Sequence, residues 1–232
     1  MEKLAKNNAA FVLDVLSGRL AFERTGVKLY DNAIRKIERY GEPRYHALVG
    51  ELRRIREEEE EHANWLESQI RGLGGNPFEK TDLAELETEE SRGIESIIVD
   101  GHDKIIHVLH ALLAAELADN AGWDLLVKLA DDTGDREAKL AFAKRMAEEA
   151  KHLLFIREAV VRSAEVEILG RDVKMPTSAA SVATGTLKKP LAIAGILSAA
   201  LLGLGALAAS GLFLLRPKMA LRPRRRLLRA IA

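Results

Sequence analysis

The sequence predicts an all-α protein, a four-helix bundle of two antiparallel hairpins with a long crossover, followed by one C-terminal transmembrane helix. Three observations support this fold class. Ala, Leu, Glu, Lys and Arg dominate the 232 residues and aromatic residues make up only 5%, which favours helix over sheet. Four long segments repeat apolar residues with a helical period. A separate run, residues 190–215, contains no charged side chain.

The first two long helices are expected at about residues 9–40 and 43–73. Gly41 and Pro43 end the first helix and begin the second, and the Gly-Gly-Asn-Pro sequence at 74–77 ends the second. The core-facing stripes are Leu13, Leu16, Leu20, Glu23, Val27, Tyr30, Ile34 and Ile37 in the first helix and Leu48, Leu52, Ile55, Glu59, His62, Leu66 and Ile70 in the second.

Residues 76–96 are acidic and weakly patterned, so we expect a long crossing connection with a short helix in it. The third long helix is expected to begin near Ser96, and a turn at 131–135 leads to the fourth, which ends around Gly170. Short turns predict antiparallel hairpins, and two hairpins joined by one long crossover is the ferritin-like arrangement. The stripes are Ile105, Leu109, Leu112, Glu116, Asn120, Trp123 and Val127, then Phe142, Met146, Glu149, His152, Ile156 and Ala159.

Charge separates the chain into two parts. Up to position 175 there are 35 acidic and 26 basic residues, a net charge of −9, and the remainder carries +9. An acidic domain suits metal cations, and a basic tail suits anionic lipid headgroups; the tail lacks the interleaved aromatics typical of nucleic-acid binding, which we do not expect. The predicted domains are therefore a bundle at 1–172, a linker at 173–189, a membrane helix at 190–215 and a basic tail at 216–232.

The 190–215 segment predicts a single-pass anchor in the cell membrane. At 1.5 Å per residue its 26 residues would extend roughly 39 Å, enough to cross a bilayer with some tilt. The N-terminus has no signal-peptide pattern, which favours a cytoplasmic metal domain. The basic residues after the span favour the opposite orientation by the positive-inside rule. We favour the cytoplasmic placement, because moving a large acidic domain across the membrane without a signal is the harder requirement.

Each of the four predicted helices places one Glu in line with the Leu and Ile of its core stripe, and two add a His three residues later. Buried carboxylates are costly unless they are paired or bind a metal. A His at i+3 reaches the same centre as its Glu, and four carboxylates with two imidazoles suit two metal ions. The spacings of the two halves are similar, which suggests a duplicated hairpin. The candidate metal ligands are Glu23, Glu59, His62, Glu116, Glu149 and His152.

This order of ligands over about residues 9–168 resembles the ferritin-like superfamily, in particular the bacterioferritin and rubrerythrin di-iron proteins. The resemblance implies a di-iron centre, with manganese as the alternative metal. It makes Glu23 and Glu116 terminal ligands and the Glu of each Glu-x-x-His motif a bridge. It also implies that Tyr30 hydrogen-bonds a ligand carboxylate and takes part in the catalytic site. Trp123 is its counterpart after Glu116; a plain core role stays open for both aromatics.

Some features depart from that family. The chain has no cysteine, which excludes disulfides, zinc–thiolate sites and the rubredoxin-type iron of rubrerythrins. Asp119 stands where rubrerythrins have an extra Glu. Within the acidic run 57–61 only Glu59 is expected to point to the core and the others to be solvated. His107 and His110 are a minor alternative metal pair, and His46 and His102 are expected to be ordinary surface residues.

The functional expectation is oxidation of Fe²⁺ by O₂ or H₂O₂, as a ferroxidase, a peroxidase or, with manganese, a catalase. Two alternatives remain open: a di-iron oxygenase acting on a membrane-soluble substrate, and a non-catalytic iron-binding membrane partner. The expected partners are Fe²⁺, O₂ or H₂O₂ and the lipid bilayer. Similar bundles commonly pair, so a homodimer or a higher homo-oligomer is expected.

Overall fold

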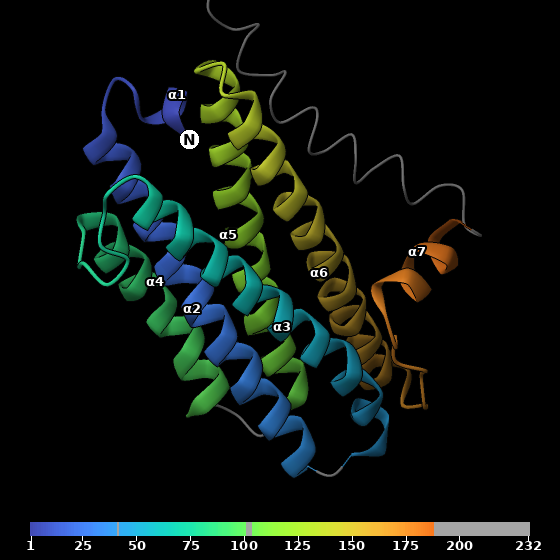
Figure 1. Ribbon diagram of the computed structural model, residues 1–232. Coiled ribbons are helices and arrows are strands. Elements are labelled where there is room, and N and C mark those ends of the chain that lie inside the picture. Colours follow the sequence, from blue (N-terminus) through green and yellow to red (C-terminus); the bar gives the residue numbers. More distant parts are fainter. Residues whose placement is uncertain (41, 101–103, 188–232) are drawn as a thin grey trace, which may run out of the picture. The chain divides into compact units, whose positions relative to one another are not determined.

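The computed structural model describes residues 1–40, 42–100 and 104–187. These residues form helices and no strand, which confirms the all-α prediction. Figure 1 shows the long helices packed side by side. In chain order the helices are α1 (Glu2–Ala5), α2 (Ala9–Tyr40), α3 (Pro43–Gly72), α4 (Asp82–Val99), α5 (Ile105–Asp132), α6 (Arg136–Leu169) and α7 (Ala179–Leu187).

Two antiparallel hairpins are present where short turns were predicted. Helix α2 packs along α3, and α5 packs along α6. Pro43 stands at the first position of α3, where its missing N–H is not needed. Gly170 follows α6 with φ of 58°, a left-handed conformation that glycine adopts without strain. The contacts α2–α5 and α3–α6 join the two hairpins.

The crossover differs from its prediction, because its helix is long. Helix α4 has 18 residues and continues past Ser96, so α5 begins at Ile105 rather than near Ser96. The N–H of Leu83 donates to Asp14 near the start of α2, and Lys36 near its end donates to the carbonyl of Ile98. Helix α4 therefore runs parallel to α2 and carries the chain along the length of the hairpins. It also contacts α5.

The apolar core divides into two clusters along the helices. One contains Leu52, Ile55, Leu109 and Phe155, and the other contains Leu16, Leu66, Trp123 and Phe142. Most of the buried acidic side chains and both buried histidines lie at sequence positions between these groups on each helix, namely Glu23, Glu59, His62, Glu116, Asp119, Glu149 and His152. A polar layer is thus enclosed by apolar side chains on both sides, where water is scarce and charge must be compensated.

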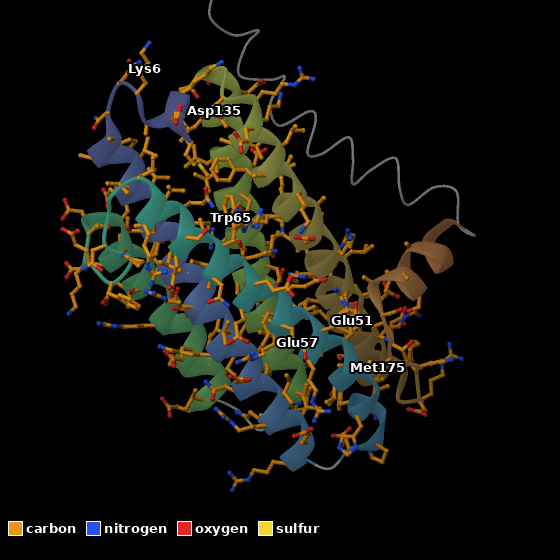
Figure 2. The ribbon with its side chains drawn as sticks, viewed as in Figure 1. Lys6, Glu51, Glu57, Trp65, Asp135 and Met175 are labelled. Carbon is orange, nitrogen blue, oxygen red and sulfur yellow. The ribbon has the colours of Figure 1, made fainter. Side chains whose placement is uncertain are left out.

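The chain divides into two units, Met1–Gly185 and Thr186–Ala232. Within the first unit, Met175 and Ala179 pack against the hairpins. Within the predicted linker 173–189, residues Ala179–Leu187 form α7, and Met175 is buried. Figure 2 shows Met175 and Glu51 of α3 at the same end of the first unit. Among the described residues, no helix is both long enough and apolar enough to span a bilayer; the predicted membrane helix 190–215 and tail 216–232 lie outside them.

Candidate metal centre

Four glutamates, one from each of the helices α2, α3, α5 and α6, meet in the polar layer. Glu23 and Glu149 are fully buried, and Glu59 and Glu116 are 1% and 2% exposed. They lie on core stripes, in helices held together by apolar contacts on both sides, so they cannot turn to solvent. The structure therefore brings together all four glutamates that the sequence singled out.

The two predicted histidines join the same layer. His62 Nδ1 lies 2.7 Å from Glu149 Oε1, and His152 Nδ1 lies 3.0 Å from Glu149 Oε2. Both rings thus turn Nδ1 toward the carboxylates, and their ring centroids are 6.4 Å apart. Their Nε2 atoms face outward, 3.1 Å from Glu148 for His62 and 2.5 Å from Glu58 for His152. An outward partner of this kind orients a ligating imidazole.

Several buried atoms in this layer make no hydrogen bond of regular geometry, including one carboxylate oxygen from each of the four glutamates and Nδ1 of His62, although the last lies 2.7 Å from Glu149. Buried polar atoms without partners are rare, and metal ions are one explanation for them. The donor atoms form three overlapping groups, each with all atoms within 4.8 Å of one another. These groups are Glu59, Glu116, Glu149 and His152; Glu23, His62 and Glu149; and Glu23, Glu59, Asp119 and Glu149. The buried cluster could thus hold metal ions.

Two aromatic side chains each donate a hydrogen bond to one of the clustered glutamates. The Tyr30 hydroxyl donates to Glu116, and the Trp123 indole N–H donates to Glu23 Oε1 at 2.9 Å. The hydrogen bond expected of Tyr30 is confirmed, and Trp123 is its counterpart. Each aromatic residue follows one glutamate by seven positions and contacts the other, so the two contacts are related across the centre.

Burial and like charges shift the pKa values of the cluster in both directions. Burial raises the pKa of Glu116 to about 8. The charge of His152 lowers this pKa, and the charge of Glu149 raises it. Burial also raises the pKa of Glu149, but its close contacts with His152 and His62 lower it by more, to about 2. Burial lowers the pKa of His62, yet Glu149 and Glu23 raise it to about 10. The cluster needs positive charge, which protons or metal ions can supply.

A buried ion pair borders the cluster on one side. Arg19 of α2 is 4% exposed, and Asp119 of α5 is 2% exposed. The Arg19 guanidinium lies 3.2 Å from Glu23 Oε1 and 3.3 Å from Asp119 Oδ1. The sequence analysis noted Asp119 only as a departure and did not consider Arg19. The signal it missed is a charged residue one helical turn before Glu23, on the same core stripe.

The prediction for the acidic run of α3 is right for Glu57, Glu60 and Glu61, which are exposed, and wrong for Glu58. Glu58, which directly precedes Glu59 on α3, contacts His152 of α6, so the edge of the core stripe reaches the neighbouring helix as well as its centre. A signal for this role was present. Both motifs have a further glutamate directly before the ligand pair, so both read Glu-Glu-x-x-His, and Glu148 takes the equivalent place.

Glycine at position 26 is a second requirement that sequence reasoning missed. A Cβ atom there would lie 2.7 Å from Glu59 Oε2, so a larger residue would push this carboxylate from its place. His46 and His110 are exposed, and His102 lies outside the described residues. Within the described part of the chain, neither His107 nor His110 belongs to a group of donors suited to a metal.

Comparison with protein-family models, with characterised proteins and with solved structures finds no match. The assignment of function therefore depends on the residues of the centre and on their geometry.

Proposed function

We propose that this chain is a membrane-held, ferritin-like di-metal protein that binds two iron ions and oxidises Fe²⁺ with H₂O₂ or O₂. One observation carries the proposal. Four glutamates from four helices converge with two histidine Nδ1 atoms in a dry layer, and each glutamate keeps a buried oxygen without a hydrogen bond. Carboxylate and imidazole donors in this ratio suit a pair of iron or manganese ions.

The overlapping donor groups support two metal positions with shared ligands. One position has Glu116 and His152 and the other has Glu23 and His62, while Glu149 belongs to both groups. Glu59 takes part with Glu116 in one group and with Glu23 in another. This arrangement fits terminal roles for Glu23 and Glu116 and bridging roles for the glutamates of the two Glu-x-x-His motifs.

The residues around the cluster fit redox chemistry on a small oxidant. A bound pair of Fe²⁺ ions supplies one electron each, so that with two protons one H₂O₂ becomes two water molecules and two Fe³⁺ remain. Tyr30 and Trp123 hold Glu116 and Glu23 by hydrogen bonds. The apolar side chains on both sides exclude water and bulky reactants.

The proposal includes a tether to the cell membrane. The charge-free run 190–215 and the basic tail that follows it support insertion into a bilayer with anionic headgroups. In this arrangement the acidic metal domain lies on the cytoplasmic side. A tether would hold oxidant removal close to membrane-bound sources of H₂O₂.

The test compares turnover in the full chain, purified in detergent and loaded with Fe²⁺ without oxygen. On mixing with H₂O₂ or O₂, ferric absorbance should rise faster than in protein-free buffer. Glu149→Ala should remove this acceleration, because it deletes a donor common to all groups. Glu57→Ala, an exposed glutamate of α3, is the matched control and should react like the unaltered chain. Equal rates in all samples and in buffer would refute the proposal.

A further inference from the structure

Arg19 reaches the cluster from one helical turn before Glu23. Its Nε lies 3.2 Å from Glu23 Oε1, and its Nη2 lies 3.3 Å from Asp119 Oδ1. Its Nη1 donates to the main-chain carbonyl of Asp119 at 3.5 Å. Nε and Nη2 lack hydrogen-bond geometry toward any acceptor. Attraction between charges, rather than directed hydrogen bonding, therefore dominates the contact of Arg19 with the two carboxylates.

The space for this guanidinium is provided by a glycine on α5. A Cβ atom at Gly122 would overlap Nη1 of Arg19 and would lie 3.1 Å from its Cζ. The ring of Phe22 is on another side, 4.3 Å from Cζ. Arg19 is thus enclosed by residues of α2 and α5 and has no route to solvent.

Neither Arg19 nor Asp119 has a charged residue at the equivalent position of the other hairpin. The offset of 93 residues that relates Glu23 to Glu116 also relates Arg19 to Leu112 and Gly26 to Asp119. Leu112 is a fully buried core residue, so an apolar side chain replaces the cation. Gly26 has no side chain in place of the acid, and its space is taken by the Glu59 carboxylate. Arg19 and Asp119 therefore occur as one pair, and neither of their counterparts, Leu112 and Gly26, carries a charge.

The charge balance of the cluster explains why Arg19 and Asp119 occur as a pair. Glu23, Glu59, Asp119 and Glu149 have oxygens within 4.8 Å of one another, and Glu116 joins them through Glu59 and Glu149. Five carboxylates carry −5, two divalent ions supply +4, and Arg19 supplies the remaining +1. Among the described residues, Arg19 is the only arginine or lysine with an ion pair to these carboxylates. A buried carboxylate without this partner would turn to a metal ion instead.

We propose that Arg19 is a positioning residue that serves as the third cation of the centre and holds Asp119 away from the metal ions. It limits the coordinating carboxylates to the four glutamates and brings the loaded centre to neutrality. The inference deepens the proposed function and rests on its two-metal site. A merely structural arginine would have the opposite signature, because its loss would loosen the site and weaken metal binding.

The test measures binding of Co²⁺, a divalent probe with a ligand-sensitive absorption spectrum, to the full chain in detergent. Arg19→Leu copies the residue found at position 112 and should tighten Co²⁺ binding by about tenfold or more, because one positive charge is lost. Asp119→Asn should weaken binding by a similar factor. The double variant should return close to the affinity of the unaltered chain. Arg19→Lys keeps the charge and should also stay close to it.

The absorption spectrum tests whether the effect of Arg19→Leu on metal binding depends on the Asp119 carboxylate. In Arg19→Leu the freed carboxylate joins one Co²⁺, so the ligand-field bands should change, and adding Asp119→Asn should reverse the change. Weaker binding in Arg19→Leu, or a spectrum unchanged by it, would overturn the inference. If Arg19→Leu does not fold, the double variant carries the test, and it must bind Co²⁺ more tightly than Asp119→Asn alone.

The same titration separates this inference from the function on which it rests. If the unaltered chain binds no Co²⁺, the proposed function fails and the inference fails with it. If the unaltered chain binds two Co²⁺ and the Arg19 variants match it in affinity and spectrum, only the inference fails.

Discussion

At the scale of single residues, the candidate centre depends on two glycines as well as on its charged side chains. Gly26 leaves room for the Glu59 carboxylate, and Gly122 leaves room for Arg19. Neither glycine has a positive φ, so the backbone conformation alone would accept alanine at both positions. Close packing against a polar side chain is the reason for glycine here.

Gly26→Ala should therefore harm metal binding more than folding. Its new methyl group meets Glu59 Oε2, which must shift, while alanine favours the helix by roughly 1 kcal/mol over glycine. We expect a weaker affinity for Co²⁺ with a free energy of unfolding that falls by less than about 1 kcal/mol. Gly50→Ala is the control, since nothing lies within 4 Å of its Cβ position. Equal Co²⁺ affinity in both variants would contradict the role given to Gly26.

At the scale of the helices, one carboxylate organises the end where α1 and α6 begin. Asp135 Oδ1 accepts from the N–H of Ala138 at 3.1 Å, and Oδ2 accepts from the N–H groups of Lys3 and Leu4 at 3.1 and 3.2 Å. It caps α6 and ties the N-terminal segment to it (Figure 2). Burial raises the pKa of Asp135, but the N–H groups of Ala138 and Leu4 and the N-terminal ammonium group lower it by more, below the ordinary value of 3.8.

Asp135→Asn should lower the free energy of unfolding by about 1–2 kcal/mol at pH 7. Because the folded pKa is depressed, the stabilisation is complete above the unfolded pKa of 3.8 and is lost as pH falls through the folded value. The deficit of the variant should thus be equal at pH 7 and pH 6 and smaller near pH 3.5. Urea unfolding at each pH measures it. A deficit that grows on acidification would contradict this account.

A chain of contacts connects α7 to the candidate metal centre. The N–H of Ala179 donates to Glu51 Oε1 at 2.9 Å, and Arg54 donates to the same oxygen at 2.9 Å. Arg54 also donates to Glu58, which contacts His152. In the second hairpin, the residue equivalent to Arg54 is the exposed Lys144, four residues before Glu148. The segment that leads toward the predicted anchor is thus linked to one histidine only.

Glu51→Ala should release α7 from α3. The amides of residues 175–183 should then exchange with deuterium faster, since a buried charged acceptor of a main-chain N–H is lost at a cost of about 1–3 kcal/mol. Hydrogen exchange followed by mass spectrometry measures this directly. Glu57→Ala, six residues later on the same helix and exposed, should leave the exchange of this segment unchanged. Unchanged exchange in Glu51→Ala would show that the apolar contacts of Met175 and Ala179 hold the segment alone.

The helices with strong apolar stripes could be predicted from the sequence, and α4 could not be predicted at its full length. Its buried residues are only Ser91 and Ile98, so most of its surface is solvated and no stripe marks it. Gly18 of α2 lets α4 approach closely, since a Cβ there would lie 3.0 Å from that of Leu83. A contact of this kind joins segments far apart in the sequence, so it cannot be recognised from the residues of either segment alone.

At the scale of the whole molecule, the similar spacing of residues in the two hairpins explains which residues of the candidate site could be predicted. Glu23 and Glu116, the two Glu-x-x-His motifs, and the pair Tyr30 and Trp123 recur with nearly the same offset, so repetition identifies them. Arg19 has no charged counterpart in the second hairpin and Asp119 has none in the first, and their pairing joins α2 to α5 across 100 residues. Repetition cannot reveal such a pair, because only the packing of the hairpins brings its members together.

The membrane tether is a prediction for the whole chain. The full chain should sediment with membranes and resist extraction by alkaline carbonate, because an apolar span dissolves only in detergent. A variant that ends after Lys189 should instead remain in the soluble fraction. A full chain released by carbonate would show that the basic tail, rather than a span at 190–215, holds it to the membrane.

The central claim is that the four buried glutamates and two histidines hold two metal ions. Metal analysis of the full chain, loaded with Fe²⁺ without oxygen and passed through a desalting column, tests it most directly. Two iron ions per chain are expected, with retention in Glu57→Ala and loss of at least one ion in Glu149→Ala. A chain that folds but retains no iron, or that retains two ions in Glu149→Ala, would contradict the account.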